Sequence, residues 1–260
     1  MKILCFIVLP LFFFSHGLCQ TYDVLKDKLS ERPHFGGVMG KYLNNPGLIF
    51  EPNVASVDGL IRFNKARPST YKIYTNRLES ILLKYQNEFQ YSLENVYDCA
   101  AYQGYRPQSE WNTICRHDLT ELGSMCSKQQ GFGFEDGQPC IALSLERIEN
   151  WLPEPYTNDT VPEKIRNDWY EYAVTVHCEG EDPVSKDNMG PILYFPAEGF
   201  HFKYFPYVGQ NGWKSPIVFV RLDSATPATV VRVTCTAYAK NMKYDDLLNT
   251  GKVSFDVMVD

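Results

Sequence analysis

Cysteine residues constrain the fold of this chain more than any other feature of its sequence. Eight of its 260 residues are cysteine, which is many for a cytosolic protein of this size and indicates an oxidising compartment. Two of them, Cys5 and Cys19, belong to the N-terminal segment. Six remain for the rest of the chain, and six cysteines allow fifteen pairings. These six are Cys99, Cys115, Cys126, Cys140, Cys178 and Cys235.

The N-terminal segment predicts export. Lys2 precedes a run over residues 3–14 that is apolar apart from Pro10, and small residues occur among residues 15–20. A short positive start, a short apolar run and small residues at its exit are typical of a secretory signal peptide, here residues 1–19. The alternative is an uncleaved short signal anchor, although a spanning helix needs about 20 apolar residues. In both interpretations residues 20–260 lie outside the cell.

The spacing of apolar residues divides the rest of the chain. Residues 20–68 show little periodicity and contain four prolines, so we expect an extended juxtamembrane segment over a surface. From about 70 to 90, apolar residues recur at steps of three and four, which predicts one long amphipathic helix. Ser69 or Thr70 is the expected N-cap, directly after Pro68. We assign residues 69–260 to one disulfide-bonded ectodomain.

After residue 140 the apolar period becomes two, with turn residues between the alternating segments. This pattern predicts a mainly β fold, an immunoglobulin-like antiparallel sandwich. Cys178 and Cys235 each lie on the apolar face of a predicted strand, so a bridge between them would join the two sheets. Sequential pairing of the other four cysteines would close short loops. The predicted strands are residues 141–146, 172–178, 200–204, 217–220, 231–237 and 253–259.

The sequence contains no signature of catalysis or of a cofactor. It has no G-x-S-x-G, H-E-x-x-H or P-loop motif and no C-x2-C pair for zinc. The histidines are scattered, and we expect His177 and His201, which lie on predicted strands, to face solvent. A net charge of −6 argues against nucleic-acid binding. We therefore expect no catalytic residue, no metal and no cofactor.

One sequon predicts a modification. Asn158 begins an Asn-Asp-Thr triplet, which is an acceptor for N-linked glycan in an exported chain. Prolines at 153, 155 and 162 flank it, as is typical of a surface loop. We expect Asn158 to carry a glycan.

Residues 202–209 carry four aromatic side chains within six positions, and Pro206 ends the predicted strand. Under a period of two, these aromatic side chains cannot all face one core. We expect some of them to be exposed, and exposed Tyr and Phe side chains are typical of protein interfaces. The alternative is a strand that is packed on both faces.

Several motifs together resemble one family, the β subunits of the Na,K-ATPase and the H,K-ATPase. Residues 132–141 (FGFEDGQPCI) are similar to that family's motif after its cysteine-rich region. Residues 204–209 (YFPYVG) look like its tyrosine- and proline-rich segment. Residues 235–244 (CTAYAKNMKY) and 253–257 (VSFDV) resemble its C-terminal signature. The resemblance is strong over about 115–260 and weaker over 40–98.

This resemblance implies a non-catalytic, glycosylated subunit of a P-type cation pump. Its partner would be the catalytic α subunit, whose folding, delivery to the plasma membrane and potassium handling the β subunit assists. The family's three disulfides are sequential, which implies the pairs Cys99–Cys115, Cys126–Cys140 and Cys178–Cys235. Contact with an extracellular loop of the α subunit maps onto Tyr204, Phe205, Pro206 and Tyr207.

The N-terminal segment departs from the family pattern. Members of the family begin with a cytoplasmic tail and a full transmembrane helix, whereas here two residues and a short apolar run occupy that place. We therefore expect a divergent member at the plasma membrane, held by the α subunit or by a short anchor, or a secreted chain if the segment is cleaved. The alternatives are a secreted adhesion or recognition module with the same fold and an extracellular enzyme without a visible motif.

Overall fold

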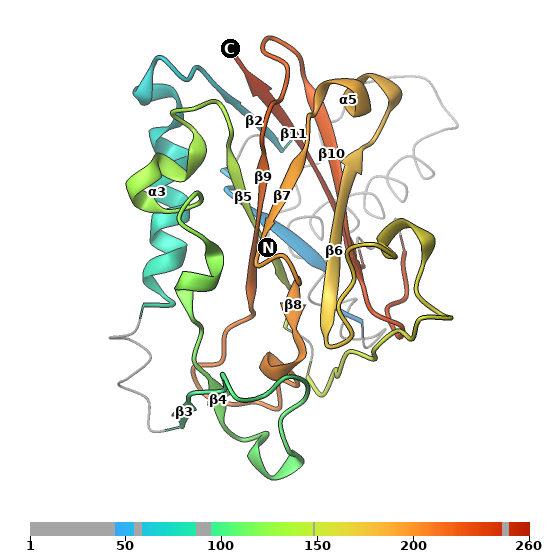
Figure 1. The fold of residues 1–260 in the computed structure, drawn as a ribbon. Helices are drawn as coiled ribbons and strands as arrows, with labels where there is room; N and C mark the ends of the chain where they lie inside the picture. Colours follow the sequence, from blue (N-terminus) through green and yellow to red (C-terminus); the bar gives the residue numbers. More distant parts are fainter. Residues whose placement is uncertain (1–44, 55–58, 87–94, 148, 246–249) are drawn as a thin grey trace, which may run out of the picture. The chain divides into compact units, whose positions relative to one another are not determined.

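Two β-sheets form the centre of the described part of the chain, which in this computed structural model comprises residues 45–54, 59–86, 95–147, 149–245 and 250–260 (Figure 1). The predicted signal or anchor segment, residues 1–19, lies outside these residues. The four-stranded sheet has the order β1-β5-β9-β7 and is antiparallel throughout. Its strands are β1 (Leu48–Glu51), β5 (Cys140–Leu145), β7 (Ile192–Phe195) and β9 (Ile217–Leu222).

The five-stranded sheet has the order β2-β11-β10-β6-β8 and is antiparallel except for the parallel pair β2 and β11. Its strands are β2 (Leu60–Phe63), β6 (Ala173–Gly180), β8 (Phe200–His201), β10 (Val231–Tyr238) and β11 (Lys252–Val259). Two short strands, β3 (Val96–Tyr97) and β4 (Ile114–Cys115), pair in parallel apart from the main sheets.

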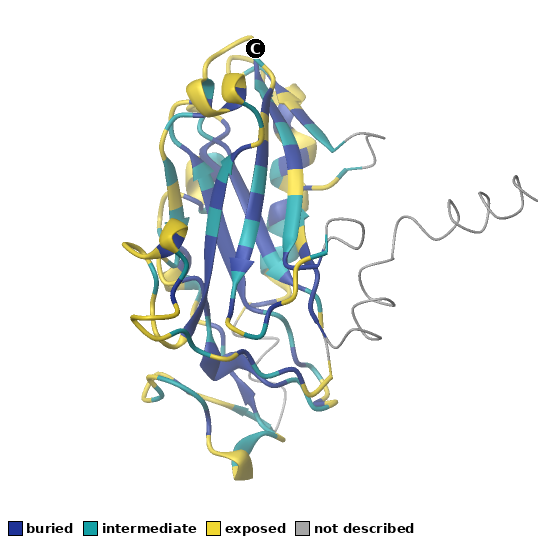
Figure 2. Cartoon of the chain, turned by 90° about the vertical axis from the view of Figure 1, so that its right-hand side faces the viewer, coloured by how far each residue is buried: buried dark blue, intermediate teal, exposed yellow. Residues whose placement is uncertain are grey.

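The hydrophobic core lies where the alternating apolar faces of the strands meet. On β10, for example, Val231, Val233 and Cys235 are fully buried, while Arg232 between them is exposed. Figure 2 colours buried residues dark blue, which lie mostly on the strands, and exposed residues yellow, which lie mostly in the loops. The predicted strands after residue 140 are confirmed for β5, β6, β9, β10 and β11. Strand β9 is a central strand, as its continuous apolar run indicated.

One long helix, α3 (Pro68–Leu83), packs its aromatic side against the region between β2 and β5. Tyr71 and Tyr74 stack on Phe134, with ring centroids 6.0 and 5.8 Å apart. The helix begins with Pro68 at its first turn, and Arg67 occupies the N-cap position that the sequence assigned to Ser69 or Thr70. Proline suits that position because its fixed φ matches the helix and its missing N–H is not needed there.

The helix ends earlier than the predicted 70–90. Leu83 is its last residue, and Tyr85 beyond it is still buried. Residues 87–90 lie outside the described residues. The remaining helices are short: α5 (Pro183–Asn188) and the 3-10 turns η1 (Gln108–Glu110), η2 (Leu119–Leu122), η3 (Lys128–Gly133), η4 (Glu163–Ile165) and η5 (Phe202–Tyr204). No helix among the described residues is long and apolar enough to cross a membrane.

Residues 20–68 are the stretch expected to be extended chain over a surface; residues 20–44 and 55–58 lie outside the described residues, and the described remainder supplies an edge strand to each sheet. Strand β1 pairs with β5 from Leu48 opposite Leu145 to Glu51 opposite Ala142. Strand β2 pairs with β11. Both strands have only four residues, which is too short for a clear period of two beside the prolines of this stretch.

The three disulfides are the sequential pairs Cys99–Cys115, Cys126–Cys140 and Cys178–Cys235. The expectation that the last pair joins the two sheets is wrong. Cys178 on β6 lies directly opposite Cys235 on β10, and these two strands are neighbours in the same sheet. Alternation in the sequence shows that both side chains face inward, but it does not show which strands are neighbours.

Replacing both Cys178 and Cys235 by alanine should lower the free energy of unfolding by about 4 kcal/mol, because this bridge closes the longest of the three loops and restricts the unfolded chain. Urea unfolding of the purified, oxidised chain measures the difference. The matched control is Thr234→Ala on β10, which removes one partly exposed hydrogen bond to Ser254 and should cost about 1 kcal/mol or less. A similar small loss in the double variant would contradict the prediction.

Candidate functional site

The aromatic segment, residues 202–209, is not the strand that its sequence predicts. Strand β8 ends at His201, and the chain then enters the 3-10 turn η5 (Phe202–Tyr204). The ring nitrogen Nδ1 of His201 accepts a hydrogen bond from the backbone N–H of Lys203 and so starts the turn. His201 is therefore half-buried and engaged, not solvent-facing as expected, and His177 on β6 is half-buried as well.

The expectation that aromatic side chains of this segment are exposed is wrong for most of it. Tyr204, Phe205 and Pro206 are buried, and Tyr207 is partly exposed. The turn breaks the period of two, so the side chains point to different parts of the core. Phe205 packs edge-on against Trp151, with ring centroids 5.4 Å apart. Of the four residues 204–207, only Tyr207 is partly exposed, while its three neighbours are packed in the core.

The backbone of the segment has left both sheets, so its carbonyl groups need other donors. Three side chains and one backbone N–H, from three different loops, supply them. The donors are Arg106 Nε to Lys203 O (2.8 Å), Trp213 Nε1 to Tyr204 O (2.9 Å), Gln210 Nε2 to Pro206 O (3.1 Å) and Asn150 N to Tyr207 O (2.7 Å). This arrangement holds the segment in one conformation without any ladder pairing.

Tyr207 forms the exposed end of this arrangement together with a neighbouring arginine. The guanidinium carbon of Arg147 lies 4.9 Å from the centre of the Tyr207 ring, which is within cation–π range. The ring also lies 5.2 Å from that of Trp213. A parallel bridge joins the backbones of Glu149 and Tyr207. Arg147 and Tyr207 are therefore fixed relative to each other.

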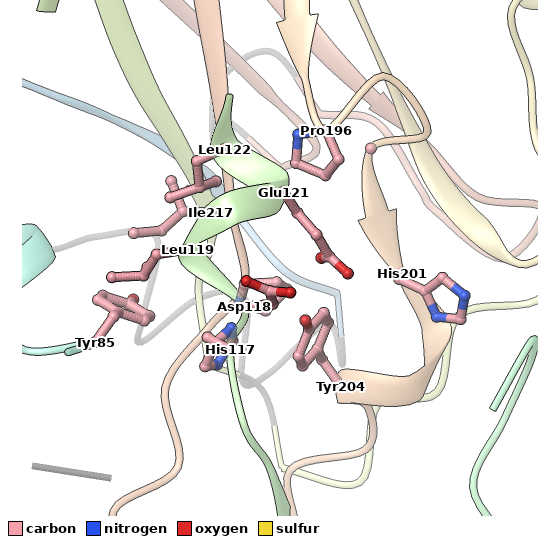
Figure 3. Close-up of a pocket in the computed structure, with 12 residues that line it drawn as sticks. Tyr85, His117, Asp118, Leu119, Glu121, Leu122, Pro196, His201, Tyr204 and Ile217 are labelled. Carbon is pink, nitrogen blue, oxygen red and sulfur yellow. The ribbon is translucent and has the colours of Figure 1, made fainter. Parts of the chain in front are cut away.

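A small pocket of about 30 Å³ lies behind the segment (Figure 3). Its volume is close to that of one water molecule. The hydroxyl of Tyr204 points toward the carboxyl groups of Asp118 and Glu121. On its other side the Tyr204 ring stacks on His117, with centroids 4.5 Å apart and planes 7° apart. Tyr85 meets the same imidazole edge-on.

Burial dominates the electrostatics of this pocket. It lowers the pKa of His117 to about 4, and the positive charges of Lys214 and Lys203 act in the same direction. Burial, helped by Lys203, also lowers the pKa of His201 to about 4. For Tyr204, burial and the negative charges of Glu121 and Asp118 raise the pKa well above its usual range. Both imidazoles are therefore neutral at pH 7.

Lys203 forms an ion pair with Glu121, one of the residues that line the pocket. Its Nζ lies 3.3 Å from Glu121 Oε1, and its side chain is largely buried. Within the described ranges, no three His, Cys, Asp or Glu side chains are grouped as metal ligands would be. The carboxylates at the pocket are engaged by Lys203 and by the hydroxyl and N–H of Thr120. This geometry favours a rigid support for the segment.

The sequon lies in an exposed turn on another part of the molecule. Asn158 is exposed at the start of a turn over residues 158–160. The hydroxyl of Thr160, the third residue of the sequon, accepts a hydrogen bond from the backbone N–H of Thr157 (2.8 Å). The Asn158 side chain is thus accessible to a glycan.

Comparison with known proteins shows which family this chain belongs to. The family model described as "Sodium / potassium ATPase beta chain" matches residues 4–255. The chain belongs to the sodium/potassium ATPase beta chain family. Membership accounts for the three disulfides and for the resemblance of residues 132–141, 204–209 and 235–257.

Relatives in this family come from several animals. A probable sodium/potassium-transporting ATPase subunit beta-3 of Caenorhabditis briggsae is 30% identical over 83% of this chain and 66% of its own length. Subunit beta-2 of Drosophila melanogaster is 29% identical over 83% of this chain and 71% of its own length. Human subunit beta-2 is 24% identical over 84% and 73%. The chain thus spans about two thirds of the length of these relatives.

The buried histidine was not singled out from the sequence. His117 is one of several scattered histidines, and it lies two positions after Cys115 in a loop-rich region. Its burial depends on Tyr85, Tyr204 and Lys214, which are distant along the chain. The contact between Arg147 and Tyr207 was missed for the same reason. Tyr207 occurs in the motif of residues 204–209 quoted above, and Arg147 lies six residues after the motif of residues 132–141.

The beta chain should lose stability as the pH falls from about 6.5 to about 4. His117 has an ordinary pKa of 6.5 in the unfolded chain and about 4 in the folded chain, so the unfolded state takes up a proton first. The loss is about 2 kcal/mol at pH 5 and about 3 kcal/mol below pH 4. His201 adds to it with the same sign. Urea unfolding at pH 7, 6 and 5 measures the slope.

The variant His117→Gln should flatten this slope, although its stability at pH 7 is lower because it leaves space beside Tyr204. Tyr85→Phe is the matched control, because it removes the hydrogen bond from the Tyr85 hydroxyl to Ser215 O (2.9 Å) but keeps His117. It should lower stability equally at each pH. An unchanged slope in His117→Gln would show that His117 is not the group that titrates.

Proposed function

We propose that this chain is the non-catalytic β subunit of a P-type ATPase that transports Na⁺ and K⁺ or H⁺ and K⁺. It binds the catalytic α subunit, assists its folding and delivery to the plasma membrane, and modulates potassium and sodium transport. The observation that carries this proposal is the match of the beta chain family to residues 4–255. The ectodomain lies on the extracellular face, and residues 1–19 form a signal peptide or a short anchor.

The geometry of the aromatic segment supports a contact with the α subunit at one end of the sandwich. The described chain begins there: Gly47 O accepts a hydrogen bond from Glu146 N, next to the β1–β5 ladder. A few residues further, Asn150 N bonds to Tyr207 O. Tyr207 therefore lies at the end of the four-stranded sheet that is nearest, along the chain, to the proposed anchor. In this proposal the α subunit contacts the surface that carries Tyr207.

Within this proposal, the four residues of the predicted interface have two roles. Tyr207 contacts the α subunit, because its ring is partly exposed. Tyr204, Phe205 and Pro206 are buried, so they act on binding only by holding the segment in place.

Tyr207→Ala should reduce the amount of α subunit that co-purifies with this chain from detergent-solubilised membranes by roughly tenfold, as for an aromatic residue at the centre of an interface. Tyr170→Ala, which removes an exposed tyrosine from a different loop, is the matched control and should leave co-purification unchanged. Recovery of the wild-type chain only from the medium, without any α subunit, would contradict the proposal and favour a secreted adhesion or recognition module.

Glycosylation of Asn158 gives a separate prediction. The chain isolated from a eukaryotic secretory pathway should lose mass on treatment with a glycosidase specific for N-linked glycans, and Asn158→Gln should abolish this loss. Asn167→Gln, at an exposed asparagine outside any sequon, is the control and should keep it. Equal mobility of the treated and untreated wild-type chain would show that Asn158 is not occupied.

A further inference from the structure

We propose that Arg147, fixed over the ring of Tyr207, binds a carboxylate on the extracellular surface of the α subunit and thereby sets the orientation of the two subunits. This inference rests on the proposed function, since it names the chemistry of the partner at the same surface.

No acceptor among the residues that the structure describes is hydrogen-bonded to the guanidinium of Arg147. Its guanidinium carbon lies 4.9 Å from the centre of the Tyr207 ring, and the residue is exposed. A guanidinium that lies over an aromatic face keeps its N–H groups at its edge, where they form a fork that matches the two oxygens of a carboxylate. The surface therefore presents a bidentate donor.

The support under Arg147 is rigid. Tyr207 packs on Trp213 at 5.2 Å between ring centroids, and Tyr207 O accepts a hydrogen bond of 2.7 Å from Asn150 N. The loop that carries Arg147 is thereby tied to the segment that carries Tyr207. A binding group that is already held in place loses little conformational entropy when its partner arrives.

Arg147 has no counter-ion within the described residues. Several other cations among the described residues have one: Arg62 pairs with Asp260, Arg77 with Glu51, and Lys128 with Glu79. None of the ion pairs in the described ranges includes Arg147. Its positive charge is thus available to a group outside the chain.

The surroundings favour a single carboxylate of a protein over an anionic lipid surface. Glu149 is exposed and its backbone is bridged to that of Tyr207, but it forms no ion pair with Arg147. The chain as a whole has a net charge of −6. A broad field of lipid phosphates would meet repulsion from this net charge, whereas a single carboxylate gains two charge-assisted hydrogen bonds from the fork of Arg147 against the same repulsion. Protein partners also use arginine often at the centre of an interface.

Arg147→Glu tests the proposal in the full-length chain co-expressed with an α subunit. The amount of α subunit that co-purifies should fall at least tenfold. The amount of α subunit that co-purifies with Arg147→Lys should lie between the amounts for the wild type and for Arg147→Glu, because lysine keeps the positive charge but lacks the two-pronged guanidinium. Arg67→Glu, at an exposed arginine at the start of α3, is the matched control and should bind like the wild type. Thermal unfolding of each purified variant checks that the fold is unchanged.

A second measurement identifies the partner group. Acidic residues in the extracellular loops of the α subunit are changed to lysine one at a time and combined with Arg147→Glu. Restored co-purification for one of these combinations, and not for its neighbours, is the expected result.

The outcomes separate this inference from the proposed function. Full co-purification of Arg147→Glu, with loss for Tyr207→Ala, would overturn the role of Arg147 and leave the β-subunit function standing. Absence of the α subunit from the wild-type preparation would overturn both. Unchanged α binding together with lost binding to phosphatidylserine vesicles in Arg147→Glu would overturn the carboxylate in favour of a lipid headgroup.

Discussion

The carbonyl groups of residues 203–207 impose a constraint on which the candidate interface depends. Because this stretch has left both sheets, each of these buried acceptors needs a donor from elsewhere. Gln210 and Trp213 follow the segment directly, whereas Asn150 and Arg106 are distant along the chain, and Arg106 belongs to the loop closed by the Cys99–Cys115 disulfide. Cys115 Sγ itself lies 3.2 Å from Lys203 O. The disulfide-bonded loop and the aromatic segment are therefore one structural unit.

Much of the fold could be predicted from the sequence, because the strands after residue 140 bury one face and expose the other. The alternation of apolar and polar residues predicts β10 and β11 clearly. It does not mark β1 and β2, which have four residues each and lie among prolines. It also does not determine which strands are neighbours. The bridge between Cys178 and Cys235 was therefore paired correctly but placed between sheets instead of within one.

Less of the candidate site could be predicted. The composition of residues 202–209 indicated that the stretch is unusual, but a 3-10 turn directs its side chains in ways that alternation does not describe. The turn buries Tyr204 and Phe205 and leaves Tyr207 at the surface. The stacking of His117 on Tyr204 and of Arg147 on Tyr207 joins residues 87 and 60 positions apart. Such contacts depend on the tertiary fold and leave no local signal in the sequence.

Strands β1 and β2 have a mechanical consequence. The chain enters at Leu48, contributes β1 to one sheet and then β2 to the other, so the same short stretch belongs to both sheets. The hydrogen bonds of β1 lie across the strand, and a pull at residue 45 acts along it. The four residue pairs of the β1–β5 ladder would then share such a load in shear instead of opening one after another. A pulling force applied at this point would therefore detach β1 from the sheet less easily than the short length of this edge strand suggests.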